Sequence, residues 1–264
     1  MFTFRPVATA AAVVLGLSAV AVPASAATIA ALQNGTTIVW IDTDQKKTTG
    51  AVTLARGATL VGIDVRPADG KVYGLAPDGA IVTVDVKTGA WEKVSQLSEA
   101  LPAGVGVAVD FNPVADRMRV IAANGLNLRV NVADGKATVD GMLKYGPTDA
   151  AMSRTPMVSA AGYTNSMAGA KETALYDVDT AAGTLLKQAP PNDGVLATVG
   201  PLGVALRGGA AFDVWADGMG GNVGWLVSGG SLHTVDLATG RATAVGPIAG
   251  LTGTITDIAI LPAK

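Results

Sequence analysis

The segment 231-SLHTVDLATGRATAVGPI-248 reads as a β-strand, a tight turn and a second β-strand. Apolar and polar residues partly alternate over residues 232–237, as on a strand with one buried face. Asp236 can accept backbone hydrogen bonds at the head of the turn, and Gly240 supplies the positive φ that ends it without steric cost. A single hairpin is marginally stable in water, so units of this kind must pack on one another.

Similar segments recur along the chain. They are 81-IVTVDVKTG-89, 127-NLRVNVADG-135, the looser copy 37-TIVWIDTD-44, and a further copy made of residues 173–179, 184–188 and 195–202. The turn positions Asp42, Asp85 and Asn131 follow one another at intervals of 43 and 46 residues. A further 105 residues separate Asn131 from Asp236, which leaves room for two more units. A period of roughly 20 to 50 residues is typical of propellers, solenoids and arrays.

Strand and turn signals divide the chain into five units of four expected strands. The expected strands are 28–32, 36–41, 48–54 and 254–262 for the first unit; 60–66, 71–76, 80–86 and 90–97 for the second; 105–112, 117–122, 126–132 and 136–143 for the third; 158–164, 174–178, 185–188 and 195–199 for the fourth; and 209–214, 224–227, 231–237 and 243–248 for the fifth. The sequence therefore predicts an all-β fold, a five-bladed β-propeller of four-stranded antiparallel blades. The C-terminal strand joins the N-terminal blade and closes the ring, which protects exposed strand edges. Residues 144–157 are expected to form a linker with one helical turn at 149–154.

Residues 1–26 have the features of a secretory signal peptide. Arg5 is the only early charge, residues 7–22 form an apolar run, and 24-ASA-26 matches a small-residue cleavage site. The apolar run is shorter than the roughly 20 residues of a membrane helix, which argues against the alternative of an uncleaved anchor. We therefore expect a single propeller domain at 27–264, exported to the periplasm or the extracellular medium and without a membrane span.

Composition narrows the classes of partner. The chain contains no Cys, so its stability does not depend on disulfides. A formal net charge of −2, with no basic block, argues against nucleic acid. The remaining partner classes are a small molecule, a glycan or a protein, and we expect the protein to be a monomer.

The third and fourth units carry the segments 110-DFNPVADRMRV-120, 127-NLRVN-131, 161-AGYTNS-166 and 175-LYDVDT-180. These segments resemble the bacterial family called domain of unknown function 4394, and the resemblance covers nearly all of the chain after the first 26 residues. Membership implies an exported, propeller-like protein and no established reaction. Met118 stands where the family pattern leads us to expect Leu, an exchange that a buried core tolerates.

Three carboxylates are expected to converge at the axis of the ring. Asp64, Asp110 and Asp213 lie on the strands expected to be innermost, and the first two each precede a Pro by three residues. Like charges placed so close repel one another unless a cation, a water molecule or an Arg lies between them. Oxygen-only ligands suit Ca²⁺ better than Zn²⁺, so we predict a structural Ca²⁺ as the one candidate cofactor.

A basic cluster on the third unit is the candidate ligand-binding site. It consists of Arg117, Arg119, Arg129 and Asn127. One hypothesis is an anionic ligand, and the other, which we favour, is a network of salt bridges between blades that uses Asp110 and Asp116. Three positive and two negative charges leave a balance of +1, which an acidic residue of the next blade or an anion could neutralise.

The other polar candidates have simpler interpretations. His233 is the only His, and the local sequence offers no acid or nucleophile as a catalytic partner, so we expect a packed or surface strand residue. The pairs Asp42/Asp44 and Asp177/Asp179 could ligate Ca²⁺, but turn capping explains them better.

Two functions of different class follow from these observations. The favoured prediction is an exported, non-enzymatic propeller that binds a ligand or partner through one loop face or its central channel. The alternative is a hydrolase or lyase, for example one directed at glycosides, that uses carboxylates in the channel. Aromatic residues that could stack on sugars are only 5% of the chain, which weakens the alternative.

Overall fold

The hairpin at residues 231–248 forms as predicted. In the computed structural model, which describes residues 27–262, β19 (Ser231–Val235) pairs antiparallel with β20 (Ala242–Pro247). A carboxylate oxygen of Asp236 accepts the backbone N–H groups of Ala238 and Thr239 at 2.8 and 3.0 Å. Gly240 follows with a φ of 78°, in the left-handed region that glycine adopts without strain.

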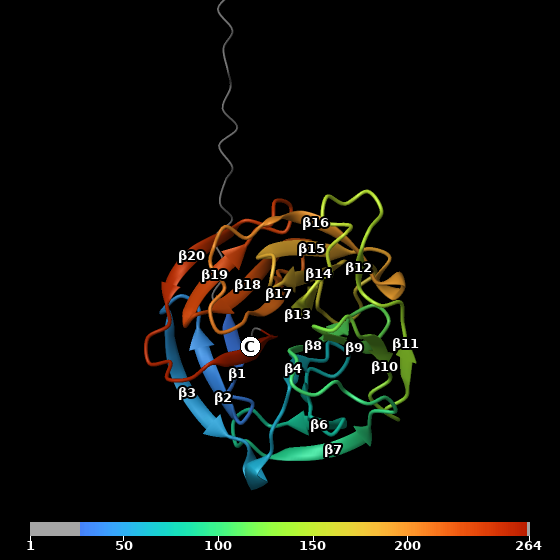
Figure 1. The fold of residues 1–264 in the computed structure, drawn as a ribbon. Helices are drawn as coiled ribbons and strands as arrows, with labels where there is room; N and C mark the ends of the chain where they lie inside the picture. Colours follow the sequence, from blue (N-terminus) through green and yellow to red (C-terminus); the bar gives the residue numbers. More distant parts are fainter. Residues whose placement is uncertain (1–26, 263–264) are drawn as a thin grey trace, which may run out of the picture.

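Five sheets stand around a common axis, and each is one blade of a propeller (Figure 1). Blade 1 contains β1 (Thr28–Gln33), β2 (Thr37–Asp42), β3 (Lys47–Thr53) and β21 (Ile255–Leu261). Blade 2 contains β4 (Gly62–Val65), β5 (Val72–Leu75), β6 (Ala80–Val84) and β7 (Trp91–Gln96). Blade 3 contains β8 (Val107–Asn112), β9 (Arg117–Ala122), β10 (Asn127–Val130) and β11 (Ala137–Val139).

The last two blades differ in their number of strands. Blade 4 contains β13 (Val158–Tyr163), β14 (Leu175–Asp179), β15 (Thr184–Gln188), β16 (Val195–Pro201) and the short β12 (Lys144–Tyr145). Blade 5 contains β17 (Ala211–Ala216), β18 (Asn222–Ser228), β19 and β20. The predicted five-bladed, all-β architecture is confirmed.

The strand β21 closes the ring, as predicted. It pairs antiparallel with β1, with Ile260 opposite Ile29 and Ile258 opposite Ala31. Blade 1 is thus built from both ends of the described chain, in the order β21, β1, β2, β3. Because β21 is the innermost strand of its blade, it also contacts the innermost strands of blades 2 and 5.

The segment between blades 3 and 4 differs from the prediction. Its first residues form β12, which adds a fifth strand to blade 4 by pairing in parallel with β16. Residues 149–154 form consecutive turns instead of a helical turn. The described residues contain no α-helix, only the 3₁₀ turns η1 (Ala55–Gly57) and η2 (Pro191–Asp193). Over residues 27–262 there is accordingly no helix of the length and hydropathy that a bilayer crossing requires.

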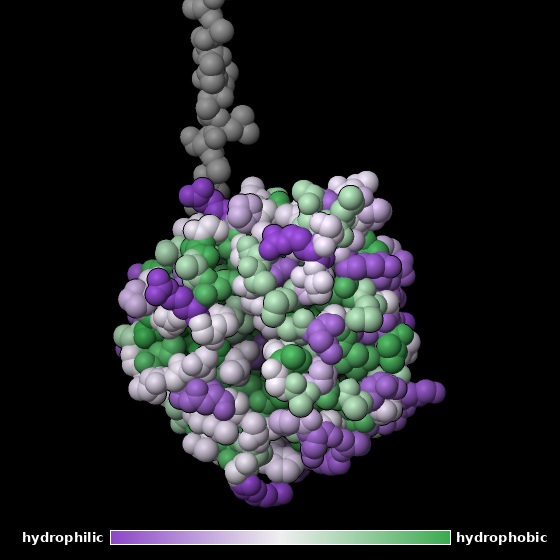
Figure 2. All heavy atoms as spheres, viewed as in Figure 1, coloured by the Kyte–Doolittle hydropathy of each residue, from purple (hydrophilic) through white to green (hydrophobic). Residues whose placement is uncertain are grey.

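The apolar core is divided among the five interfaces between neighbouring blades, here called seams. Each seam contains one cluster of buried side chains, drawn from the two blades that flank it. In the seam between blades 2 and 3, Tyr73 meets Phe111 edge to face, with ring centroids 5.4 Å apart. Met118 is fully buried in the same cluster. On the face drawn in Figure 2, hydrophilic residues are spread around the periphery instead of gathering in one patch.

Candidate functional site

The innermost strands bring four carboxylates together near the axis. Asp64, Asp110 and Asp213 each have an oxygen within 4.8 Å of the other two. Asp257 on β21 is electrostatically coupled to all three. All four side chains are buried, with 3–4% of their surface exposed. The structure thus joins the three acids that the sequence singled out, and adds a fourth; we call these four residues the axial ring.

Each carboxylate of the axial ring also ties its blade to the next one. Asp64 accepts the N–H of Val65 on its own strand at 2.6 Å and that of Phe111 in blade 3 at 2.7 Å. Asp110 in turn accepts the N–H of Tyr163 in blade 4 at 3.1 Å. The carboxylates therefore satisfy backbone donors that face the axis, where no neighbouring strand could pair with them.

The same contacts recur where the ring closes. Asp213 of blade 5 accepts the N–H of Ile260 in blade 1 at 2.7 Å. Asp257 of blade 1 accepts the N–H of Ile63 in blade 2 at 3.0 Å. Sequence reasoning placed Asp257 in the closing strand without assigning it to the site. Its position on an innermost strand, shared with the other three acids, was the signal that could have identified it.

Blade 4 alone contributes no carboxylate to this arrangement. The N–H of Tyr163 donates to Asp110, so the residue before Tyr163, Gly162, occupies the place that Asp110 holds in blade 3. A Cβ atom at Gly162 would lie 3.0 Å from Cγ2 and 3.1 Å from the backbone nitrogen of Val214. Blades 4 and 5 therefore pack closely at this position, and a side chain at Gly162 would have to displace Val214 by a few tenths of an ångström.

Burial raises the pKa of every acid in the axial ring. Loss of hydration is the largest cause for each carboxyl group, and repulsion from Asp213 raises the pKa of Asp64 further. The donated backbone N–H groups act in the opposite direction. The pKa of Asp213 rises to about 6. The arrangement favours a positive charge at its centre, either shared protons or a metal ion.

A mouth opens at the end of the axis where the innermost strands begin. It is a cavity of about 350 Å³ whose lining includes Val61, Val107, Ser159, Ala210 and Ile255, so that all five blades contribute to it. No charged side chain lines it. Asp64, Asp110 and Asp213 lie three positions further along their strands, about 10 Å deeper. The carboxylates thus lie below the mouth instead of in its wall.

Two further hollows adjoin the mouth, one on each side of blade 1. A hollow of about 330 Å³ shares Thr59 and Leu60 with the mouth and is mainly apolar, with Trp91 in its wall and Asp78 as its one charged residue. A hollow of about 400 Å³ shares Gly208 and Gly209 with the mouth and contains Arg207. Together with the mouth, the two hollows form one continuous concave surface. The composition and the strand pattern did not predict this surface.

The basic cluster of blade 3 forms a buried network with partners other than those predicted. Arg119 is 2% exposed and donates to Asp140 at 2.7 Å, to Asn127 at 2.8 Å and to Asn192 at 3.0 Å. Its Nε donates to the hydroxyl of Tyr163 at 3.1 Å. Asp140 also accepts two bonds from Arg129, at 2.7 and 2.9 Å. The favoured hypothesis of salt bridges between blades is thus met only in part: the ion pairs with Asp140 lie within blade 3, and the bonds of Arg119 to blade 4 go to the uncharged groups of Tyr163 and Asn192.

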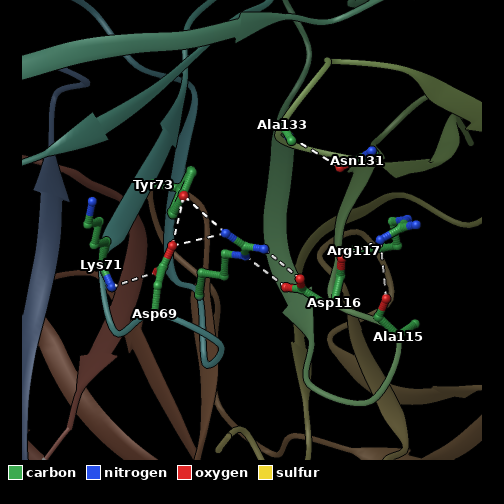
Figure 3. A network of polar contacts seen from close by, with 9 residues as sticks. Asp69, Lys71, Tyr73, Ala115, Asp116, Arg117, Asn131 and Ala133 are labelled. Carbon is green, nitrogen blue, oxygen red and sulfur yellow. Dashed lines mark hydrogen bonds and ion pairs between the residues drawn. The ribbon is translucent and has the colours of Figure 1, made fainter.

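The predicted partners Asp110 and Asp116 lie elsewhere. Asp110 belongs to the axial ring, and Asp116 binds Arg66 of blade 2 with contacts of 2.5 and 2.8 Å. In Figure 3, Asp116 and Asp69 reach the same guanidinium, that of Arg66, while Arg117 turns away toward the carbonyl of Ala115. Arg117 is exposed and does not join the cluster, because its position at the start of β9 lies outside the seam.

The remaining candidates are placed as follows. His233 is 8% exposed within β19, a packed strand residue as expected. Asp42 caps a turn, accepting the N–H groups of Asp44 and Gln45. Asp179 caps another, but Asp177 caps none and is fully buried without a hydrogen-bond partner. Turn capping is therefore the wrong interpretation of Asp177.

Two solved structures are similar to this chain, and the first of them supports the fold. A protein of unknown function from Bacteroides thetaiotaomicron matches with a TM-score of 0.52 and 17% identity, over 87% of this chain and 60% of that one. A protein of unknown function from Bacteroides caccae matches with a TM-score of 0.43 and 14% identity, over 83% of this chain and 72% of that one. The chain thus spans less than two thirds of the B. thetaiotaomicron protein. A search of curated proteins finds no match.

The segments that suggested a family lie at the seam between blades 3 and 4 and at the axis. Asp110, Arg119 and Tyr163 belong to those segments, and all three are buried in the polar contacts described above. A family model described as domain of unknown function (DUF4394) matches residues 36–259, from the first blade to the closing strand. The chain therefore belongs to the domain of unknown function 4394 family.

Proposed function

We propose that this propeller is an exported, non-enzymatic binding module whose ligand enters the axial mouth. The observation that carries the proposal is the mouth itself, about 350 Å³ in volume and lined by uncharged residues of all five blades. Its volume lies at the lower end of the range for small-molecule sites. Export rests on the signal-peptide pattern of residues 1–26, which lie outside the described residues.

The alternative, a hydrolase or lyase that uses channel carboxylates, has less support. A glycosidase places two carboxyl groups on either side of its substrate, with a separation that admits the sugar or a water molecule. Here the carboxylates of the axial ring are 3–4% exposed, and each accepts a backbone N–H of the next blade. Carboxyl groups held in this way connect blades and are not presented to a substrate.

Blocking the mouth is expected to abolish ligand binding without unfolding the protein. Val105 lines the mouth and is 38% exposed, so Val105→Trp places a large ring in the cavity without displacing the core. The matched control is Val94→Trp, because Val94 is also 38% exposed but lies on the outer strand β7. Small molecules and glycans that raise the melting temperature of the wild-type protein should also raise that of Val94→Trp. They should leave the melting temperature of Val105→Trp unchanged. Ligands that stabilise both variants equally would exclude the mouth as the site.

We also propose that the axial ring binds Ca²⁺ as a structural ion. Three carboxylate oxygens that lie within 4.8 Å of one another, with a fourth acid beside them, form an oxygen-only set of the kind that Ca²⁺ accepts. A cation would offset the mutual repulsion that burial makes severe.

Calcium is therefore expected to raise the melting temperature, and a chelator to lower it. Calcium at a hundred times its dissociation constant would add about 2.7 kcal/mol of stability. Asp213→Asn should remove this response, whereas Asp236→Asn, an exposed turn acid of the same blade, should retain it. A wild-type protein that contains no metal after purification, and whose melting is the same in calcium and in chelator, would refute the calcium site.

A further inference from the structure

The seam between blades 3 and 4 contains a carboxylate without a partner. Asp177 on β14 is 0% exposed, and neither of its oxygens has a hydrogen-bond partner. It lies between Ala161 of β13 and Leu186 of β15. Both neighbours belong to the apolar cluster of this seam. An isolated charge at such a position would be very unfavourable.

Two other buried polar atoms of blade 4 also lack partners. They are Oγ1 of Thr184 and Oε1 of Gln188. Both residues lie on β15, two positions before and two positions after Leu186, which is paired with Asp177. The side chains of Thr184, Leu186 and Gln188 therefore lie on the same face of the sheet as that of Asp177. Each of these atoms can accept a hydrogen bond from a protonated carboxyl or from a bridging water molecule.

The charged and titratable groups near this seam are Arg119, Asp140, Tyr163, Tyr145 and Asp179. Arg119 extends from β9, where Asp140, Asn127, Asn192 and Tyr163 already bind its guanidinium. The hydroxyl of Tyr145 on β12 donates to Asp179 at 2.6 Å. Asp179 lies two residues after Asp177, on the same face of β14. Arg119 is the only one of these groups that acts noticeably on the carboxyl of Asp177.

Burial outweighs that attraction. Loss of hydration raises the pKa of Asp177 from 3.8 to about 8, and the positive charge of Arg119 only partly opposes the rise. The absence of hydrogen-bond partners independently favours a neutral Asp177, because no donor contacts the carboxyl to stabilise its ionised form.

A loop of blade 4 connects this seam to blade 3. Its residue Asn192 accepts a bond from Arg119, and Pro191 accepts bonds from Gln188 at 2.5 Å and from Asn127 at 3.0 Å. The backbone of Gly141 in blade 3 binds the carbonyl of Asn192. We call residues 189–194 the strap, because they hold the outer part of the seam closed.

We propose that Asp177 is a proton-controlled latch: it is a neutral acid while blades 3 and 4 are packed, and its ionisation favours opening of the seam with release of the strap. Opening admits water to the carboxyl and removes the cause of its neutrality. The latch does not depend on the proposed ligand or on the calcium site, because Asp177 belongs to neither.

The direction of the pH effect follows from the proton count. Between pH 3.8 and about 8 the closed seam holds a proton that the open form releases. The equilibrium constant for opening should therefore rise by about tenfold per pH unit across this window and level off above it. Stability of the closed seam is greatest in acid and is lost as the pH rises.

Hydrogen exchange in the full protein tests this proposal. After correction for the intrinsic exchange rate, strap amides should open about tenfold more often per pH unit between pH 5 and 8 in the wild-type protein. Asp177→Asn, which stays neutral, should remove this dependence. Asp134→Asn, an exposed turn acid of blade 3, should preserve it. If Asp177→Asn does not fold, Asp177→Leu provides the same test without a polar group to satisfy.

An infrared difference spectrum between the wild-type protein and Asp177→Asn gives an independent readout. At pH 6 the wild-type protein should show the carbonyl band of one additional protonated carboxyl, and this band should disappear above pH 8. A carboxylate band at pH 6 would overturn the proposal. The proposal would also be overturned if hydrogen exchange of the strap amides had the same pH dependence in the wild-type protein and in the neutral variants.

Discussion

Removal of residues 254–264 is expected to abolish cooperative folding of the whole ring, not only of blade 1. The deletion removes β21, which pairs with β1 and carries the buried residues Ile255 and Ile258. Burial of each Ile contributes about 1.5–3 kcal/mol, so the two together contribute about 3–6 kcal/mol, a large share of the roughly 5–15 kcal/mol that is typical of native proteins. The loss of Asp257 also frees the N–H of Ile63 in blade 2.

Thermal and urea unfolding, followed by circular dichroism, would measure this effect. The matched control lacks residues 262–264 only, so it retains all of β21 and should unfold like the intact protein. The expected result for the longer deletion is a broad, non-cooperative transition with exposed apolar surface, because the edge of β1 is left unpaired. An unchanged melting temperature would show that the ring does not need its closing strand.

Arg119→Ala is expected to destabilise the protein by about 3–5 kcal/mol, the cost of removing one partner from a buried ion pair. The side chains of Arg119 and Asp140 are 2% and 4% exposed, and the guanidinium binds groups from both blades of its seam. Its removal leaves Asn127, Asn192 and the hydroxyl of Tyr163 without the donor that each now has. Urea unfolding of both proteins at one pH would measure the difference.

Arg129→Ala is the matched control, since Arg129 binds the same carboxylate. Its side chain is 36% exposed, so its ion pair should contribute no more than about 1 kcal/mol. The rival hypothesis of an anion site predicts that Arg119→Ala keeps wild-type stability and loses only stabilisation by added anions. That outcome would reassign Arg119 from a structural to a ligand-binding role.

The blade repeat could be predicted from the sequence because its signals are local. The strand pattern and the turn signals lie within one hairpin, and Asp236 and Gly240 act on backbone groups a few residues away. Counting the copies was enough to predict five blades and a closing strand. The short strand β12 was missed because its two residues have no pattern of their own, and only the edge of β16 makes them a strand.

The convergence of Asp64, Asp110 and Asp213 followed from the same counting, because equivalent positions on innermost strands must approach the axis. The fourth acid, Asp257, was missed although it holds the equivalent position on the innermost strand of blade 1, because that strand comes from the other end of the chain. The position of each of the four acids on an innermost strand was thus local information, available from the repeat.

Ion-pair partners were decided by tertiary structure alone. Asp116 is next to Arg117 in sequence and binds Arg66 of blade 2, 50 residues away. Arg119 binds Asp140, 21 residues away in its own blade, and Asn192 across the seam. Asp177 looks like a turn-capping acid and is instead a buried group without a partner. Local sequence determines which backbone groups a side chain can reach, but burial and charge pairing depend on which blade faces which, and that geometry exists only once the ring has closed.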